Sequence, residues 1–72
     1  MHLFHNLSLA QTHVDKALRS VIEQRRRIEW LIAHGHDATE YEAMQRMLAA
    51  LLDDMIEHRD KLEDEVKRRA FG

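Results

Sequence analysis

Seventy-two residues are enough for one domain, and a single hydrophobic core of this size is marginal without a metal, a disulfide or a second chain. The chain has no cysteine, which excludes a disulfide framework and a thiolate metal site and suits the cytoplasm. The formal net charge is −2, proline is absent, and only Gly35 and Gly72 would interrupt a helix. We therefore expect one all-α, cytoplasmic domain over residues 1–72.

The first predicted helix covers about residues 8–34. Ser8, with Gln11 three residues on, is a capping-box pattern that would begin it. Apolar side chains then follow a heptad, as in a helix that packs along another helix. One heptad position holds Leu7, Val14, Val21 and Ile28, and the position three residues on holds Ala10, Ala17, Gln24 and Leu31. The residues before Ser8 include neither a basic region nor an unbroken apolar run, so we expect no secretory leader and no membrane span.

The stretch around Gly35 separates two helical patterns and predicts a tight turn at about residues 35–37. Glycine adopts the left-handed conformation that commonly ends a helix. Asp37 and Thr39 carry oxygens that can accept hydrogen bonds from the free N–H groups of the next helix, with Glu40 or Glu42 placed to complete a capping box. A helix end followed directly by a helix start predicts an antiparallel two-helix hairpin.

The second predicted helix covers about residues 38–69 and repeats the heptad. One position holds Tyr41, Leu48, Met55 and Leu62, and the position three residues on holds Met44 and Leu51. With the turn near residue 36, positions whose numbers sum to about 72 should lie level across the hairpin. This register brings Val21 level with Leu51.

Both apolar arcs are wider than a two-helix contact requires, which predicts a second hairpin and hence a homodimeric four-helix bundle. Residues 1–36 carry five basic groups against three acidic ones, and residues 37–72 carry six against ten, so the two helices of a hairpin attract each other. A different partner protein would cover the same surface. The residues expected at the seam and interface are Leu18, Val21, Ile22, Leu48, Leu51, Leu52, Met55 and Ile56.

Six histidines suggest metal binding as an alternative function, since imidazole is a ligand for several transition metals. The chain lacks the Glu-x-x-His motif of di-iron bundles. His13, Asp54 and His58 would lie close together in the hairpin, and a dimer would supply two such sets. The competing interpretation is that these histidines are solvated or bonded to neighbours, and on that interpretation no cofactor is expected.

The remaining polar features predict no catalytic site. There is no nucleophile–base–acid set and no glycine-rich phosphate loop, so we expect no enzyme. The run Arg25-Arg26-Arg27 fans out around a helix and forms no single basic face, which makes nucleic acid an unfavoured partner. Trp30, His34 and His36 gather near the turn, where they offer a surface for a larger protein.

The turn Gly35-His36-Asp37, followed later by His58-Arg59-Asp60, resembles a set of short uncharacterised bacterial proteins that look like helical hairpins with a Gly-His-Asp turn. The resemblance implies a small helical hairpin and carries no activity with it. From the sequence we expect a non-enzymatic protein–protein interaction or regulatory module. Metal binding or metal sensing is the alternative, and nucleic-acid binding is the less favoured one.

Overall fold

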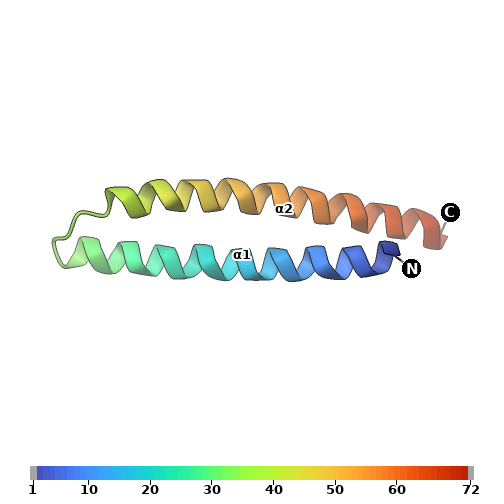
Figure 1. Cartoon of the computed structure of the whole chain (residues 1–72), viewed down its shortest axis with the longest axis horizontal. Helices are drawn as coiled ribbons and strands as arrows, with labels where there is room; N and C mark the ends of the chain where they lie inside the picture. The colour runs from blue at the N-terminus through green and yellow to red at the C-terminus, as the bar shows by residue number, and fades with distance from the viewer. Residues whose placement is uncertain (1, 72) are drawn as a thin grey trace.

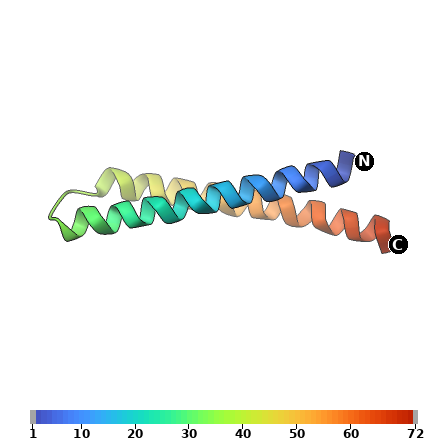
Figure 2. The same cartoon turned by 90° about the horizontal axis from the view of Figure 1, so that it is seen from below.

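In the computed structural model, which describes residues 2–71, the chain forms two long helices joined by a short turn (Figure 1). Helix α1 spans His2–Ala33 and helix α2 spans Thr39–Phe71. The helices run antiparallel along a rod of 56 × 16 × 14 Å and cross at a shallow angle (Figure 2). The predicted all-α hairpin is confirmed, while Met1 and Gly72 of the predicted domain lie outside the described residues.

Helix α1 begins six residues before the predicted cap at Ser8. Ser8 lies inside the helix, where its backbone carbonyl accepts a hydrogen bond from the Thr12 hydroxyl at 3.1 Å. No proline or glycine precedes it, and the half-buried Leu3 and Leu7 extend the apolar seam toward the N-terminus. Packing of these two leucines therefore continues the helix beyond its local capping signal.

The turn follows the chemistry of a glycine C-cap. Gly35 has a φ of +74°, and the amide of His36 donates to the carbonyl of Leu31 at 2.8 Å while the amide of Gly35 donates to that of Ile32 at 3.1 Å. These two bonds are the Schellman pattern. Asp37 lies just before α2 and caps its first turn, because its carboxylate accepts hydrogen bonds from the backbone amide of Thr39 at 2.9 Å and from the Thr39 hydroxyl at 2.6 Å. The Thr39 hydroxyl therefore donates a hydrogen bond to Asp37, whereas the sequence suggested that it would accept one from an amide of α2.

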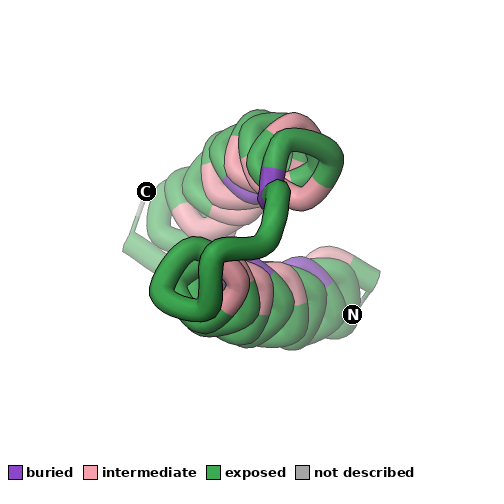
Figure 3. The backbone as a smooth tube through the Cα atoms, turned by 90° about the vertical axis from the view of Figure 1, so that its left-hand side faces the viewer, coloured by how far each residue is buried: buried purple, intermediate pink, exposed green. Residues whose placement is uncertain are grey.

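The seam of α1 lies where its heptad predicts. Every member of the two heptad positions is buried or half-buried, and Ala10, Val14 and Val21 are the most buried (Figure 3). Val14 and Val21 form the core together with Leu52 of α2. Apart from Gln24, these heptad positions carry small or apolar residues, so this is the face that α1 buries.

The seam of α2 is rotated relative to the prediction. Tyr41, Leu48, Met55 and Leu62 do face α1, but the second row lies four residues on, not three. Leu52 is 8% exposed, whereas the expected seam residues Leu51 and Met44 are 49% and 52% exposed. The buried or half-buried second row consists of Gln45, Leu52, Arg59 and Val66.

The two helices meet in the predicted register. His13 and His58 line one shallow hollow, and Gln24 and Leu48 line another, so residues whose numbers sum to about 72 are indeed level. Across residues 2–71, neither helix contains an apolar stretch of the length that a bilayer crossing needs.

Candidate interaction surfaces

A short apolar stripe, which we call the Leu18 face, lies on the outside of α1. Leu18 and Ile22 are one helical turn apart and 45% and 42% exposed. Asp15 lies three residues before this pair and Arg25 three residues after it, so the stripe has one charge of each sign at its ends. Beyond these two charges, the exposed side chains of Phe4 and Ile32 add further apolar surface toward the two ends of α1.

A second apolar surface, which we call the methionine groove, belongs to α2. Met44, Met47 and Leu51 are 52%, 74% and 49% exposed, and they line an open groove of about 760 Å³. Ala43, Leu48 and Ala50 complete its lining, and carboxylates stand at both ends, on Glu40 and Asp54. Flexible thioethers along a shallow groove adapt readily to different partner shapes.

The two apolar surfaces lie on opposite sides of the hairpin. Leu51 and His58 are seven residues, or about two helical turns, apart, so they lie on the same side of α2. His58 shares a hollow with His13, so this side of α2 lies beside the His13 side of α1. At 3.6 residues per turn, Leu18 is about 140° around α1 from His13. Ile56, which packs against the core, is likewise about 140° around α2 from Leu51 and so lies on the side of the Leu18 face. A single flat contact therefore covers one surface and leaves the other in solvent.

The eight residues expected at the seam and interface divide between core and surface. Val21 and Leu52 are buried, and Leu48, Met55 and Ile56 pack against them. The other three, Leu18, Ile22 and Leu51, are exposed. The sequence did not indicate that Leu51 faces the opposite side from the other two.

The candidate metal ligands do not come together within one chain. His13 and His58 line the same hollow of about 230 Å³, with Asn6, Leu9, Ala10 and Leu62 around them, but Asp54 lines the methionine groove. Among residues 2–71, no group of three or more histidine, aspartate or glutamate side chains is arranged to hold a metal ion. Asp54 and His58 are one helical turn apart on α2, but Asp54 lines the methionine groove whereas His58 lines the hollow that it shares with His13.

Trp30, His34 and His36 form a stack of rings at the turn. The ring centroids of Trp30 and His34 are 4.1 Å apart at an interplanar angle of 23°, and those of Trp30 and His36 are 5.8 Å apart at 13°. His34 Nδ1 lies 2.8 Å from the carbonyl oxygen of Trp30. The structure thus brings the three residues of the predicted partner surface together, and Trp30 remains 55% exposed.

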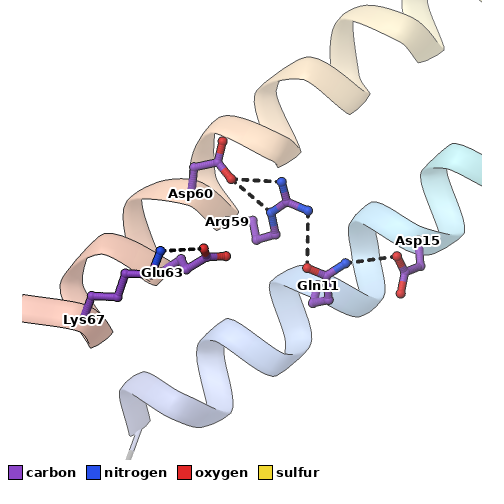
Figure 4. A network of polar contacts seen from close by, with 6 residues as sticks. All are labelled: Gln11, Asp15, Arg59, Asp60, Glu63 and Lys67. Carbon is purple, nitrogen blue, oxygen red and sulfur yellow. Dashed lines mark hydrogen bonds and ion pairs between the residues drawn. The ribbon is translucent and has the colours of Figure 1, made fainter. Parts of the chain in front are cut away.

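One polar network ties the helices together near the chain ends (Figure 4). Arg59 forms an ion pair with Asp60 at 2.9 Å and donates across the seam to the Gln11 side-chain oxygen at 3.3 Å. Gln11 in turn donates to the Asp15 carboxylate at 3.0 Å. Arg59 takes a seam position because its alkyl stem packs while its charged end reaches the surface.

The chain matches none of the protein-family models, curated proteins or solved structures with which it was compared. The resemblance to short bacterial hairpin proteins therefore stays a prediction from the turn motif. Evidence for function comes from the exposed surfaces.

Proposed function

We propose that the protein is a small, non-enzymatic protein–protein interaction module that works as a homodimeric four-helix bundle. The observation that supports this proposal is the exposed Leu18 face, together with Ile56 and Ala49, which are half-buried on the same side. A second hairpin laid on that side adds the layer that a helix pair lacks.

The size of the core supports the same proposal. The core cluster consists of Val14, Val21 and Leu52, and no large side chain in the described part of the chain is completely buried. Domains below about 70–80 residues rarely obtain sufficient stability from one core of this kind. Association is the remedy that adds buried apolar area without adding chain.

The surface area of the hairpin is also larger than that of a typical monomer. The chain exposes 5819 Å², whereas a globular protein of this mass exposes about 4,700 Å². A standard interface removes about 800 Å² from each partner, which would offset most of this difference of about 1,100 Å². The excess is therefore of the size that one dimer contact covers.

The surfaces that a Leu18-face dimer leaves free would serve a larger protein partner. They are the methionine groove and the Trp30 stack at the turn. Exposed tryptophan and methionine side chains are common anchors at protein interfaces. We propose that the dimer presents two copies of each surface.

Sedimentation equilibrium over a wide range of protein concentration tests the dimer. We expect the mass to approach twice that of the chain as the concentration rises. A folded monomer at every concentration, with full helicity by circular dichroism, would contradict the proposal. Alanine at Asp64, an exposed residue outside both apolar surfaces that takes part in no ion pair within residues 2–71, provides the control and should leave the mass unchanged.

A further inference from the structure

We infer that the dimer is antiparallel, with α1 packed on α1 of the second copy, and that each Arg25 pairs with the partner's Asp15. This inference rests on the proposed homodimer and names its face and orientation. The twofold axis passes between Leu18 and Ile22, so the Leu18 face packs against itself. The two apolar residues form the centre of the contact, and the two charges form its ends.

The spacing along the stripe supports this arrangement. Successive members Asp15, Leu18, Ile22 and Arg25 are three, four and three residues apart, as in a helix-packing seam. A twofold axis perpendicular to α1 near residue 20 exchanges the ends of this stripe. Leu18 then meets the partner's Ile22, and Arg25 meets the partner's Asp15. Because a twofold contact occurs twice, the interface contains two ion pairs.

Both charges are available for such a contact. Among residues 2–71, Arg25 takes part in no ion pair, although five other ion pairs form. Asp15 accepts one hydrogen bond, from the neutral Gln11 amide, and is otherwise unpaired within this range. Both residues are exposed. An oppositely charged group on a second copy would satisfy each of them.

A parallel dimer through the same face places like charges together. Rotation about the long axis of the rod would lay each α1 over the partner's α2. In the observed register, Asp15 would then lie between the partner's Asp53 and Asp60, and Arg25 would lie level with the partner's Arg46. Two repulsive contacts replace two attractive ones, so the antiparallel form is favoured.

The methionine grooves of two copies would pack poorly against each other. A twofold axis through Met47 would bring Glu40 beside the partner's Asp54, and a parallel contact would bring each carboxylate beside its own copy. Like charges at both ends of an apolar contact oppose association. The groove therefore remains free in the inferred dimer.

Charge exchange tests the pairing directly. Arg25→Asp and Asp15→Arg should each raise the dimer dissociation constant on the order of tenfold or more, because each turns two attractive contacts into repulsive ones. The double variant, which restores opposite charges in exchanged positions, should recover most of the lost affinity. No recovery in the double variant, or no effect of either single change, would overturn the pairing.

Face variants separate this inference from the proposed function. Leu18→Glu should abolish dimerisation, and the matched Met47→Glu should leave it intact, because Met47 is the more exposed side chain and faces away from the inferred contact. Loss of dimerisation in Met47→Glu but not in Leu18→Glu would overturn the inference and leave the proposed dimer in place. If both variants lose association, and the wild-type mass rises beyond that of a dimer, the Leu18 face of one copy packs on the methionine groove of the next. Such head-to-tail stacking would also overturn the inference. A wild-type chain that stays monomeric would contradict the proposed function itself.

Orientation has an independent readout, because the chain has no cysteine. An equal mixture of Asp15→Cys and Arg25→Cys should be joined efficiently by a short bis-maleimide cross-linker, and Arg25→Cys alone should not. In the parallel form Arg25 would lie level with the partner's Arg46, so efficient cross-linking between Arg25→Cys and Arg46→Cys chains, with none between Asp15→Cys and Arg25→Cys chains, would overturn the antiparallel form.

Discussion

At the scale of single residues, the turn depends on one backbone conformation. Gly35 has positive φ, and a Cβ added there would meet no atom within 4 Å. The cost of Gly35→Ala is therefore conformational and not steric. We expect it to lower the free energy of unfolding by about 1 kcal/mol, because the penalty for alanine in the left-handed region is partly offset by the smaller conformational entropy of the unfolded chain. Urea denaturation checks this value, and Gly35→Asn should lose less because asparagine tolerates the left-handed region.

Asp37 gives the stability of the hairpin a defined dependence on pH. The hydrogen bond from the Thr39 hydroxyl, followed by that from the Thr39 amide, holds the pKa of the Asp37 carboxyl below its ordinary value of 3.8. Because the pKa is lower in the folded state, the cap contributes stability above pH 3.8 and loses it as the pH falls through the folded-state pKa.

The difference in unfolding free energy between wild type and Asp37→Ala should therefore shrink as the pH falls below 3.8. Urea titrations followed by circular dichroism at a series of pH values measure it. Asp64→Ala is the matched control, since no ion pair involves its carboxylate within residues 2–71. A pH-independent difference for Asp37→Ala would show that its carboxylate does not cap α2 in solution.

At the scale of the helices, the sequence determined α1 better than α2. The α1 seam was predictable because nearly all of its heptad positions carry small or apolar residues. In α2, the row that faces α1 includes Gln45 and Arg59, while Met44 and Leu51 lie outside it. A hydrophobicity pattern therefore favours the wrong row. Only packing against α1 selects the observed one, even though the side-chain oxygen of Gln45 is buried there without a hydrogen-bond partner.

Adjacent leucines of α2 provide a direct test of this rotation. Leu52→Ala should lower the free energy of unfolding by about 2–4 kcal/mol, because it removes part of a three-residue core. Leu51→Ala should cost about 0.5 kcal/mol or less, since that side chain is half exposed and faces away from the inferred dimer contact. Denaturation at one protein concentration compares the two. Equal losses of unfolding free energy in the two variants would support the rotation of α2 expected from the sequence and contradict the one observed.

At the scale of the whole molecule, the arrangement of surfaces required the structure. The sequence showed that both helices carry more apolar residues than one contact needs, but it did not show that the surplus on α1 and on α2 points to opposite sides. That result depends on the rotation of α2, which places Leu51 outside the seam. The turn trio was predictable, because Trp30 and His34 are one helical turn apart and the glycine turn brings His36 back toward them.

If dimerisation completes the fold, the melting temperature must depend on protein concentration. For a dimer of this length, a tenfold rise in concentration changes the free energy by about 1.4 kcal/mol, and the entropy of unfolding converts that to about 4–5 °C. Circular dichroism melts of wild type over a hundredfold concentration range should show twice this shift. Ile22→Glu, which places a charge at the centre of the inferred contact, should melt lower and lose the dependence. A wild-type melting temperature that stays constant would mean that the hairpin is stable alone, and the exposed Leu18 face would then contribute nothing to folding.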